Sequence, residues 1–121
     1  MTKPRNSTTR ELFGIIGKIP NAGKVQSEWN AFFKEKGMDA FMDRYATTVD
    51  NLPERLSEMF HFDRRMYIVG KLLQKAIIPL LDVLDASAEK EGSVNVVLNE
   101  GGVMKGLFLD EGFSPEQFDV N

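Results

Sequence analysis

The loop from Gly17 to Val25 carries residue types that bind phosphate in nucleotide-binding proteins. A P-loop has the pattern GxxxxGK[ST] between a strand and a helix, where backbone N–H groups and the lysine hold phosphate oxygens. Here five residues separate Gly17 from Gly23, and Val25 replaces the hydroxyl that would bind magnesium. The glycines are better explained by a strand-to-helix turn. Lys24, at the expected start of a helix, still marks a place that attracts a carboxylate or phosphate.

Thiolate and imidazole chemistry has little basis in this sequence. The absence of cysteine excludes disulfides, and the single histidine makes a zinc site of the usual His/Cys type unexpected. That histidine, His61, stands between Phe60 and Phe62 near the expected end of a helix. We interpret it as a structural residue, and we predict no metal site.

Composition and charge exclude further classes of protein. The 121 residues suffice for one domain with one core, and a formal net charge of −3 gives no reason to expect a nucleic-acid partner. No apolar run approaches the roughly 20 residues needed to span a bilayer. The polar first ten residues are followed by no apolar signal-peptide segment. We therefore expect a cytoplasmic protein that binds neither nucleic acid nor membranes.

Short apolar runs, each closed by glycine or polar residues, predict five strands. They lie at residues 12–16, 40–45, 66–69, 94–98 and 103–109. The four residues Asn99-Glu100-Gly101-Gly102 between the last two are typical of a hairpin turn, because glycine adopts positive φ at little cost.

Helical spacing of apolar residues predicts helices between these strands. Trp29 and Phe33 lie on the buried stripe of the first helix. The second begins at Pro53, after a cap at Asp50 or Asn51, because proline is tolerated in the first turn of a helix.

The chain from 71 onward completes the expected topology. Residues 71–84 are interpreted as an apolar helix interrupted by Pro79, and 86–91 as one or two further helical turns. The fold class predicted is α/β, a three-layer open mixed sheet, mostly parallel, with a C-terminal antiparallel hairpin and helices on both faces. The domain is expected over 11–113, between a disordered tail at 1–10 and a C-terminal tail at 114–121.

Five segments in a fixed order resemble the N-terminal substrate domain of the shikimate dehydrogenase family. They are FGIIG, WNAFF, PLLDVLD, EGSVNVVLNEGG and KGLFLDEGF, and the match runs from about Leu12 to Phe113 with essentially no gaps. The resemblance implies an oxidoreductase family of aromatic amino-acid biosynthesis, and an open sheet that binds a small hydroxylated carboxylic acid at its edge. It also implies NADP, held by a second domain. The chain contains no GxGxxG pattern, so we expect no cofactor domain and no bound cofactor in it.

Two of the family's motifs are altered here. The first loop of the family carries SKSP, whose serines bind the substrate carboxylate, and this sequence has residues 23–26, GKVQ, so that only Lys24 is retained. The family's NVTxPxK, which ends in the catalytic lysine, aligns with residues 68–74. Its asparagine, threonine and lysine are thereby replaced by Ile68, Gly70 and Gln74.

Two positions match the family, and they complete the expected site. Asn95 occupies the position of a substrate-binding asparagine, and Asp110 that of the aspartate that pairs with the catalytic lysine. The resemblance thus implies Lys24, Asn95 and Asp110 as substrate-binding residues, with Asp110 also a catalytic candidate. Lys75 becomes a second catalytic candidate if a one-residue insertion brings it into the position of the lost lysine. Asn95 has the alternative role of tying down a loop backbone.

The functional prediction is a substrate-binding domain that does not complete the dehydrogenase reaction alone. An amide such as Gln74 has no suitable pKa for proton transfer, and no residues for binding the nicotinamide cofactor are present. The alternative is a non-catalytic binding, regulatory or self-assembling module that kept only the fold. The expected partners are a small polar carboxylic acid and a separate cofactor domain. A second copy of the chain is the remaining candidate, with Phe108, Leu109 and Phe113 as exposed residues that would bury an apolar surface.

Overall fold

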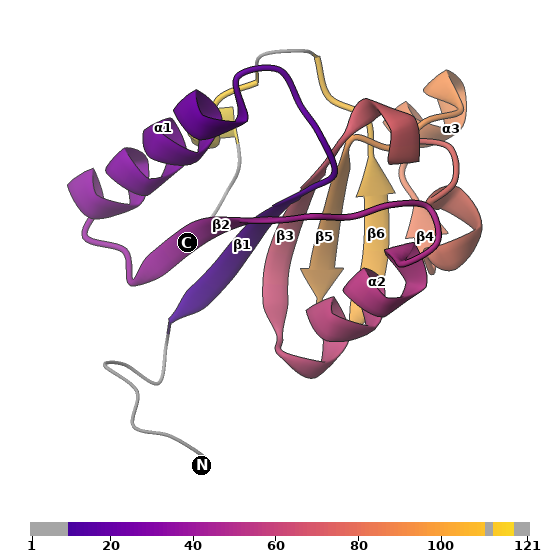
Figure 1. Ribbon diagram of the computed structural model, residues 1–121, viewed down its shortest axis with the longest axis horizontal. Coiled ribbons are helices and arrows are strands. Elements are labelled where there is room, and N and C mark those ends of the chain that lie inside the picture. Colours follow the sequence, from indigo (N-terminus) through magenta and orange to yellow (C-terminus); the bar gives the residue numbers. More distant parts are fainter. Residues whose placement is uncertain (1–9, 111–112, 118–121) are drawn as a thin grey trace.

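The computed structural model describes residues 10–110 and 113–117 as strands and helices in alternation around one sheet (Figure 1). The tail expected at 1–10 falls almost entirely outside these residues. The strands are β1 (Glu11–Ile16), β2 (Ala40–Tyr45), β3 (Arg64–Val69), β4 (Val83–Leu84), β5 (Val96–Glu100) and β6 (Val103–Leu107). The helices are α1 (Ala22–Glu35), α2 (Leu52–His61) and α3 (Ala86–Glu91), with 3-10 turns η1 (Lys71–Leu73), η2 (Ile78–Leu80) and η3 (Pro115–Gln117).

The sheet has the strand order β2-β1-β3-β5-β6-β4. β1 runs parallel to both of its neighbours, β2 and β3, while β5 is antiparallel to β3 and to β6. The expected α/β class with a mixed sheet and a C-terminal hairpin is confirmed. The hairpin turn lies where the glycines predicted it, with positive φ at Gly101 and Gly102. The hairpin itself is not at the edge of the sheet, because the short strand β4 pairs outside β6.

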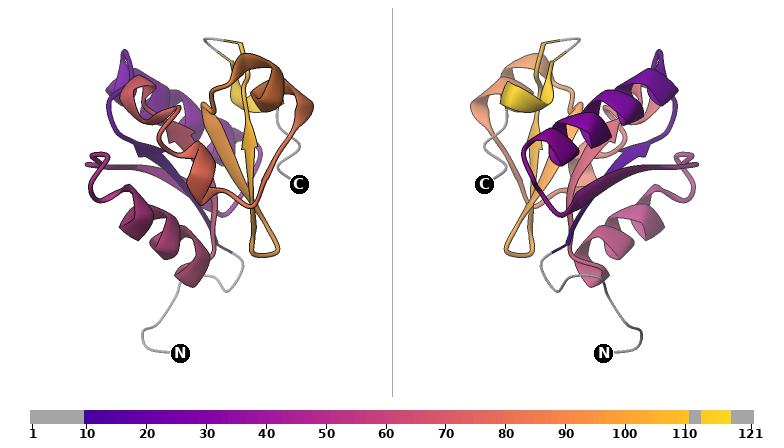
Figure 2. Two further views of the ribbon diagram at one scale, coloured as in Figure 1. Left: turned by 90° about the vertical axis from the view of Figure 1, so that its right-hand side faces the viewer. Right: turned by 90° about the vertical axis from the view of Figure 1, so that its left-hand side faces the viewer.

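Alternate side chains of the central strands point to opposite faces, so each face of the sheet has its own apolar cluster. Under α1 the rings of Phe13, Trp29 and Phe33 lie between 4.7 and 6.1 Å apart. The other cluster lies under α2 and α3 and includes Met59 and Ala88. Figure 2 shows α1 and α2 on opposite sides of the sheet. The predicted three layers are therefore present.

Residues 71–84 do not form the helix that their apolar spacing predicts. One helical turn forms, in which Ile77 donates its N–H to the Leu73 carbonyl at 3.0 Å and both side chains are buried. Pro79 lies in η2, and the chain becomes extended at Leu81, with φ −96° and ψ 155°. The next residues, Val83 and Leu84, then pair with β6 as β4. The missing N–H of proline and the free edge of β6 explain why the helix ends.

The outer edge of β2 is covered by side chains of α1. Asn30 accepts the Met42 N–H through Oδ1 at 2.7 Å and donates to the Met42 carbonyl at 3.1 Å. Gln26 donates to the same carbonyl, also at 3.1 Å. These two amides satisfy backbone groups that no neighbouring strand reaches, and they hold α1 against the outer edge of β2.

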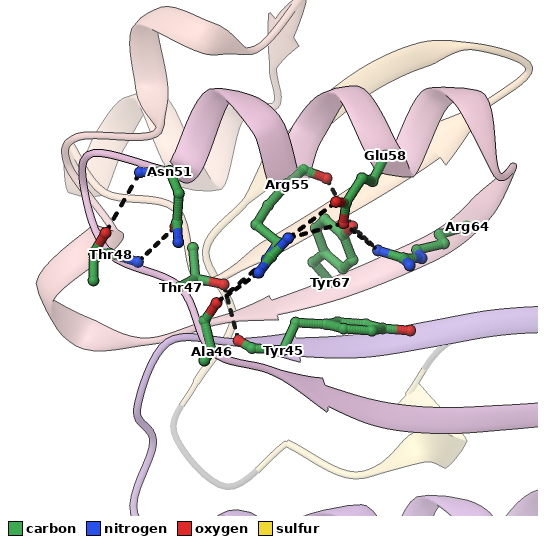
Figure 3. A network of polar contacts seen from close by, with 9 residues as sticks. All are labelled: Tyr45, Ala46, Thr47, Thr48, Asn51, Arg55, Glu58, Arg64 and Tyr67. Atoms are coloured by element: carbon green, nitrogen blue, oxygen red, sulfur yellow. Dashed lines mark hydrogen bonds and ion pairs between the residues drawn. The ribbon is translucent and has the colours of Figure 1, made fainter.

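A polar network joins β2, α2 and β3 on the other face (Figure 3). Arg64 donates to Glu58 at 3.1 Å and to the Tyr67 hydroxyl at 2.9 Å, and its guanidinium carbon lies 4.1 Å from the centre of the Tyr45 ring. Tyr67 in turn donates to the Arg55 carbonyl at 2.8 Å. Burial raises the pKa of Tyr67 above its ordinary value, although the adjacent Arg64 acts in the opposite direction.

Among the described residues, no helix is both long enough and apolar enough to span a membrane.

Candidate functional site

The carboxyl ends of β1, β3 and β6 and the amino end of β5 meet at one edge of the sheet. Backbone hydrogen bonds connect them there: Gly70 donates to Ile16 at 2.7 Å, Val69 to Asn95 at 2.9 Å, and Asn95 to Leu107 at 3.0 Å. This is the edge at which open α/β sheets bind ligands. The topology thus brings the elements that carry the predicted site residues to the same place.

The side chain of Asn95 is buried and both ends of its amide are used. It donates to the Leu109 carbonyl at 2.7 Å and accepts the Leu109 N–H at 2.8 Å. Of the two roles considered for this residue, holding a backbone segment is the one that these contacts describe. The segment held is the one that leads directly into Asp110.

Gln74, at the position of the family's catalytic lysine, also serves the backbone. The side-chain Nε2 donates to the Val69 carbonyl at 3.1 Å, and the backbone carbonyl of Gln74 accepts the Val94 N–H at 2.9 Å. The side chain therefore connects the end of β3 to the turn that follows. The backbone of Gln74 connects the same turn to Val94, just before β5.

Lys75 and Asp110 are both exposed and are not in contact. The Lys75 ammonium is directed to the Gly92 carbonyl, 3.4 Å away. The backbone carbonyl of Asp110 accepts the Phe113 N–H at 3.2 Å, and the residue itself is exposed. The pairing that a one-residue insertion would produce is thus not formed here. Lys24 is exposed in the first turn of α1.

The apolar residues expected to be exposed beside Asp110 are half-buried instead. Leu109 and Phe113 pack against the cluster under α1, with the Phe113 ring 6.3 Å from that of Trp29. Phe108 is also half-buried, and its N–H donates to the Ser87 hydroxyl at 2.9 Å. Their exposure was predicted wrongly, because Leu109 and Phe113 pack beneath α1 and Phe108 lies beside Ser87 of α3.

The loop after β1 lies directly on the loop after β3. A side chain at Gly70 would place its Cβ 2.6 Å from the backbone nitrogen of Lys18 and 2.8 Å from the Lys18 carbonyl oxygen. Real Cβ atoms do not approach backbone so closely. The glycine that stands at the position of the family's threonine is therefore required by the path of the first loop, because a threonine would displace it.

A groove of about 700 Å³ lies on the other side of that loop, between the start of α1 and the end of β2. Lys18, Arg44 and Thr48 are among its lining residues. The sequence analysis missed this groove, since a charged residue such as Arg44 in an alternating strand is read as solvent-facing. Among the residues that the structure describes, no group of three or more His, Cys, Asp or Glu side chains is placed to hold a metal ion.

No family model matches the chain, but individual proteins do. The shikimate dehydrogenase (NADP(+)) of Alkaliphilus metalliredigens is 34% identical over 115 residues, which are 87% of this chain and 40% of that protein. The corresponding enzyme of Chlorobaculum tepidum is 28% identical over 116 residues, 90% of this chain and 38% of that protein. The chain is homologous to the N-terminal substrate-binding domain of shikimate dehydrogenases.

Solved structures of shikimate dehydrogenases have the same fold. Shikimate 5-dehydrogenase from Listeria monocytogenes, in complex with shikimate and NAD, superposes with a TM-score of 0.77 at 25% identity, over 87% of this chain and 36% of that one. The Thermus thermophilus enzyme in complex with shikimate gives 0.71 at 26% identity, over 80% and 37%. The homology thus extends over nearly all of this chain, and the chain spans about two fifths of the curated relatives that it matches.

Proposed function

We propose that this chain binds a small hydroxylated carboxylic acid, of the shikimate type, at the edge where β1, β3, β5 and β6 meet. The observation that carries this proposal is the topology of that edge. It gathers the starts and ends of the elements bearing Lys24, Asn95 and Asp110, of which Lys24 is more than half of the sequence away from the other two. The homology to shikimate dehydrogenases supports the same ligand class.

Each of the three residues has a distinct role in this proposal. Lys24, exposed at the start of α1, attracts the carboxylate, and the carboxylate of Asp110 accepts a hydrogen bond from a ligand hydroxyl. Asn95 acts through Leu109: its two hydrogen bonds fix the backbone from which Asp110 projects. Asn95 is thereby a positioning residue.

Hydride transfer is not part of what we propose for this chain alone. Transfer from a hydroxyl requires a proton acceptor within hydrogen-bond reach, and the Gln74 amide that replaces the lysine is occupied by the Val69 carbonyl. A nicotinamide cofactor, which the relatives use, would be supplied by a separate domain or protein in the cytoplasm. We therefore propose that this chain alone binds the acid and does not oxidise it.

A second candidate function follows from the contact between Gly70 and Lys18. With the first loop seated on Gly70, space that a threonine would occupy in a shikimate dehydrogenase is filled by backbone. This favours a non-catalytic binding or regulatory module that kept the fold while its pocket was rebuilt for another ligand. The two candidates differ in whether shikimate itself binds.

Titration of the purified chain with shikimate, followed by amide NMR shifts, separates them. We expect saturable shifts at Lys24, Asn95 and Asp110, and an affinity about ten-fold lower in Asp110→Asn, because a hydrogen bond to a charged group is lost. Asp50→Asn, at an exposed residue in the turn before α2, serves as the matched control. Absence of shifts at millimolar shikimate would contradict the proposed ligand and favour the rebuilt module.

A further inference from the structure

The guanidinium of Arg44 differs from those of the other arginines that the structure describes. Arg10, Arg55, Arg64 and Arg65 each form an ion pair with an aspartate or glutamate. Within residues 10–110 and 113–117, Arg44 has no such carboxylate partner. Asp43, its neighbour in β2, accepts the backbone N–H of Arg44 at 2.8 Å and forms no ion pair with the Arg44 guanidinium.

Arg44 lines the groove between the start of α1 and the end of β2. One of its terminal nitrogens lies 4.0 Å from where a Cβ on Gly23 would be, so the side chain extends along the groove toward α1. Lys18, on the loop after β1, lines the same groove and is exposed. Asp43 is the acidic residue among the lining residues, so the two cations outnumber it.

Hydrogen bonds hold the segment after β2, which also lines the groove (Figure 3). Arg55 donates to the Ala46 carbonyl at 3.1 Å, and Asn51 accepts the Thr48 N–H at 2.8 Å. The Thr48 hydroxyl accepts the Asn51 N–H at 3.4 Å, which leaves its own proton available to a ligand oxygen. Thr48 is therefore a lining residue that can supply one further hydrogen bond.

We propose that this groove binds the phosphate group of a small phosphorylated molecule, at a site separate from the edge assigned to the carboxylic acid. The planar fork of Arg44 matches two phosphate oxygens, Lys18 supplies a second positive charge, and Thr48 donates a further hydrogen bond. At about 700 Å³ the groove has the size of small-molecule sites, and it exceeds what inorganic phosphate alone would fill. The rest of the ligand lies along the loop after β1.

Inorganic phosphate is the probe for the first experiment, titrated at constant ionic strength and followed by amide NMR. Saturable shifts are expected at Lys18, Arg44 and Thr48, with affinity lowered at least about ten-fold in Arg44→Gln. Arg44→Lys is expected to retain part of the affinity, because it keeps the charge and loses only the fork. Arg10→Gln, an exposed arginine at the other end of the sheet, is the matched control and should bind as the unaltered chain does.

Acetate in a parallel titration is expected to bind more weakly, because it brings one negative charge where phosphate brings nearly two. The proposal is overturned if phosphate shifts are spread over unrelated lysines without saturation, or if they persist in Arg44→Gln. Acetate binding as tightly as phosphate would also overturn the phosphate assignment. Shikimate titration is followed at a different set of residues, Lys24, Asn95 and Asp110. The two proposed sites are therefore tested separately, and failure of one does not decide the other.

Discussion

The side-chain amide of Asn95 and the backbone of Leu109 exchange two hydrogen bonds, of 2.7 and 2.8 Å, across 14 residues of sequence. Asn95 precedes β5, and Leu109 follows β6, so the pair closes the open end of the hairpin that these strands form. The β hairpin is thus fixed at both ends, by its glycine turn and by this amide. Asp110, the next residue, leaves the sheet in a direction that the pair determines.

Replacing Asn95 by alanine is expected to lower the free energy of unfolding by about 2–3 kcal/mol, because two backbone groups of Leu109 lose their partner. Urea denaturation followed by the fluorescence of Trp29, the single tryptophan, measures this loss. Glu28→Gln on the exposed surface of α1 is the control. A loss no larger than that of the control would show that water replaces the amide and that the pair does not hold the hairpin.

Gly70→Ala is expected to destabilise the chain by about 1–3 kcal/mol, since its Cβ would meet the Lys18 backbone at 2.6 Å and the first loop would have to move. Gly23→Ala in α1 is a matched control with the opposite expectation. Its Cβ would meet no atom closer than 4.0 Å, and alanine in a helix gains roughly 0.5–1 kcal/mol over glycine. Thermal unfolding of both variants tests the contact, and equal behaviour of the two would refute it.

Asp85 caps the start of α3 by accepting the Ala88 N–H at 3.1 Å, and we expect Asp85→Ala to cost about 1 kcal/mol. Partial burial alone would raise the pKa of Asp85, but hydrogen bonds from Ser87 and Ala88 hold it below its ordinary value. The charged form is therefore favoured by folding. Its contribution is complete above the unfolded pKa of 3.8 and is lost as pH falls through the lower folded value.

Unfolding measured in urea at a series of pH values checks this dependence. The stability advantage over Asp85→Asn, whose amide caps without a titrating charge, should shrink as pH falls below 3.8. An advantage that is the same at pH 6 and at the acid limit would mean that the carboxylate charge has no role in the cap.

Tyr67→Phe is expected to lower stability by about 1–2 kcal/mol, because the Arg55 carbonyl and Arg64 both lose a partner. Burial raises the pKa of Tyr67, with Arg64 opposing, so the folded chain resists ionisation of the phenol. The contribution of the Tyr67 phenol to stability is then constant below pH 10.0 and falls as pH rises above 10.0 toward the folded value. A shallower alkaline decline in the variant is expected, and an unchanged slope would exclude Tyr67 as its source.

Much of the fold follows from local patterns in the sequence. The strand at Ala40–Tyr45 and the helix after Asn51 have the positions predicted, because their apolar spacing and the proline agree with the tertiary structure. Asn51 does not cap the helix as expected: its side chain accepts the Thr48 N–H instead. The failure at 71–84 has a tertiary cause, since Val83 and Leu84 form a strand only because β6 offers them an edge.

For the site, sequence comparison placed Lys24, Asn95 and Asp110 on segments that the fold does bring to one edge. What it could not supply is where each side chain makes its hydrogen bonds. The Asn95 side chain donates a hydrogen bond to the backbone of Leu109, 14 positions along the chain, and the Gln74 side chain donates to the backbone of Val69, five positions before it. Both contacts depend on the path of the folded chain. Whether an arginine has an ion-pair partner depends in the same way on the folded chain, and among the described arginines Arg44 differs from the others in having none.

The amides that α1 places against Met42 have a consequence for the behaviour of the chain at high concentration. A six-residue strand at the margin of a sheet offers unpaired backbone groups to other molecules and is a common starting point for aggregation. Here Asn30 and Gln26 already occupy the central N–H and carbonyl of that strand. Two helix side chains thereby block intermolecular β pairing at this strand. Resistance of the protein to fibril formation consequently depends on α1 remaining folded.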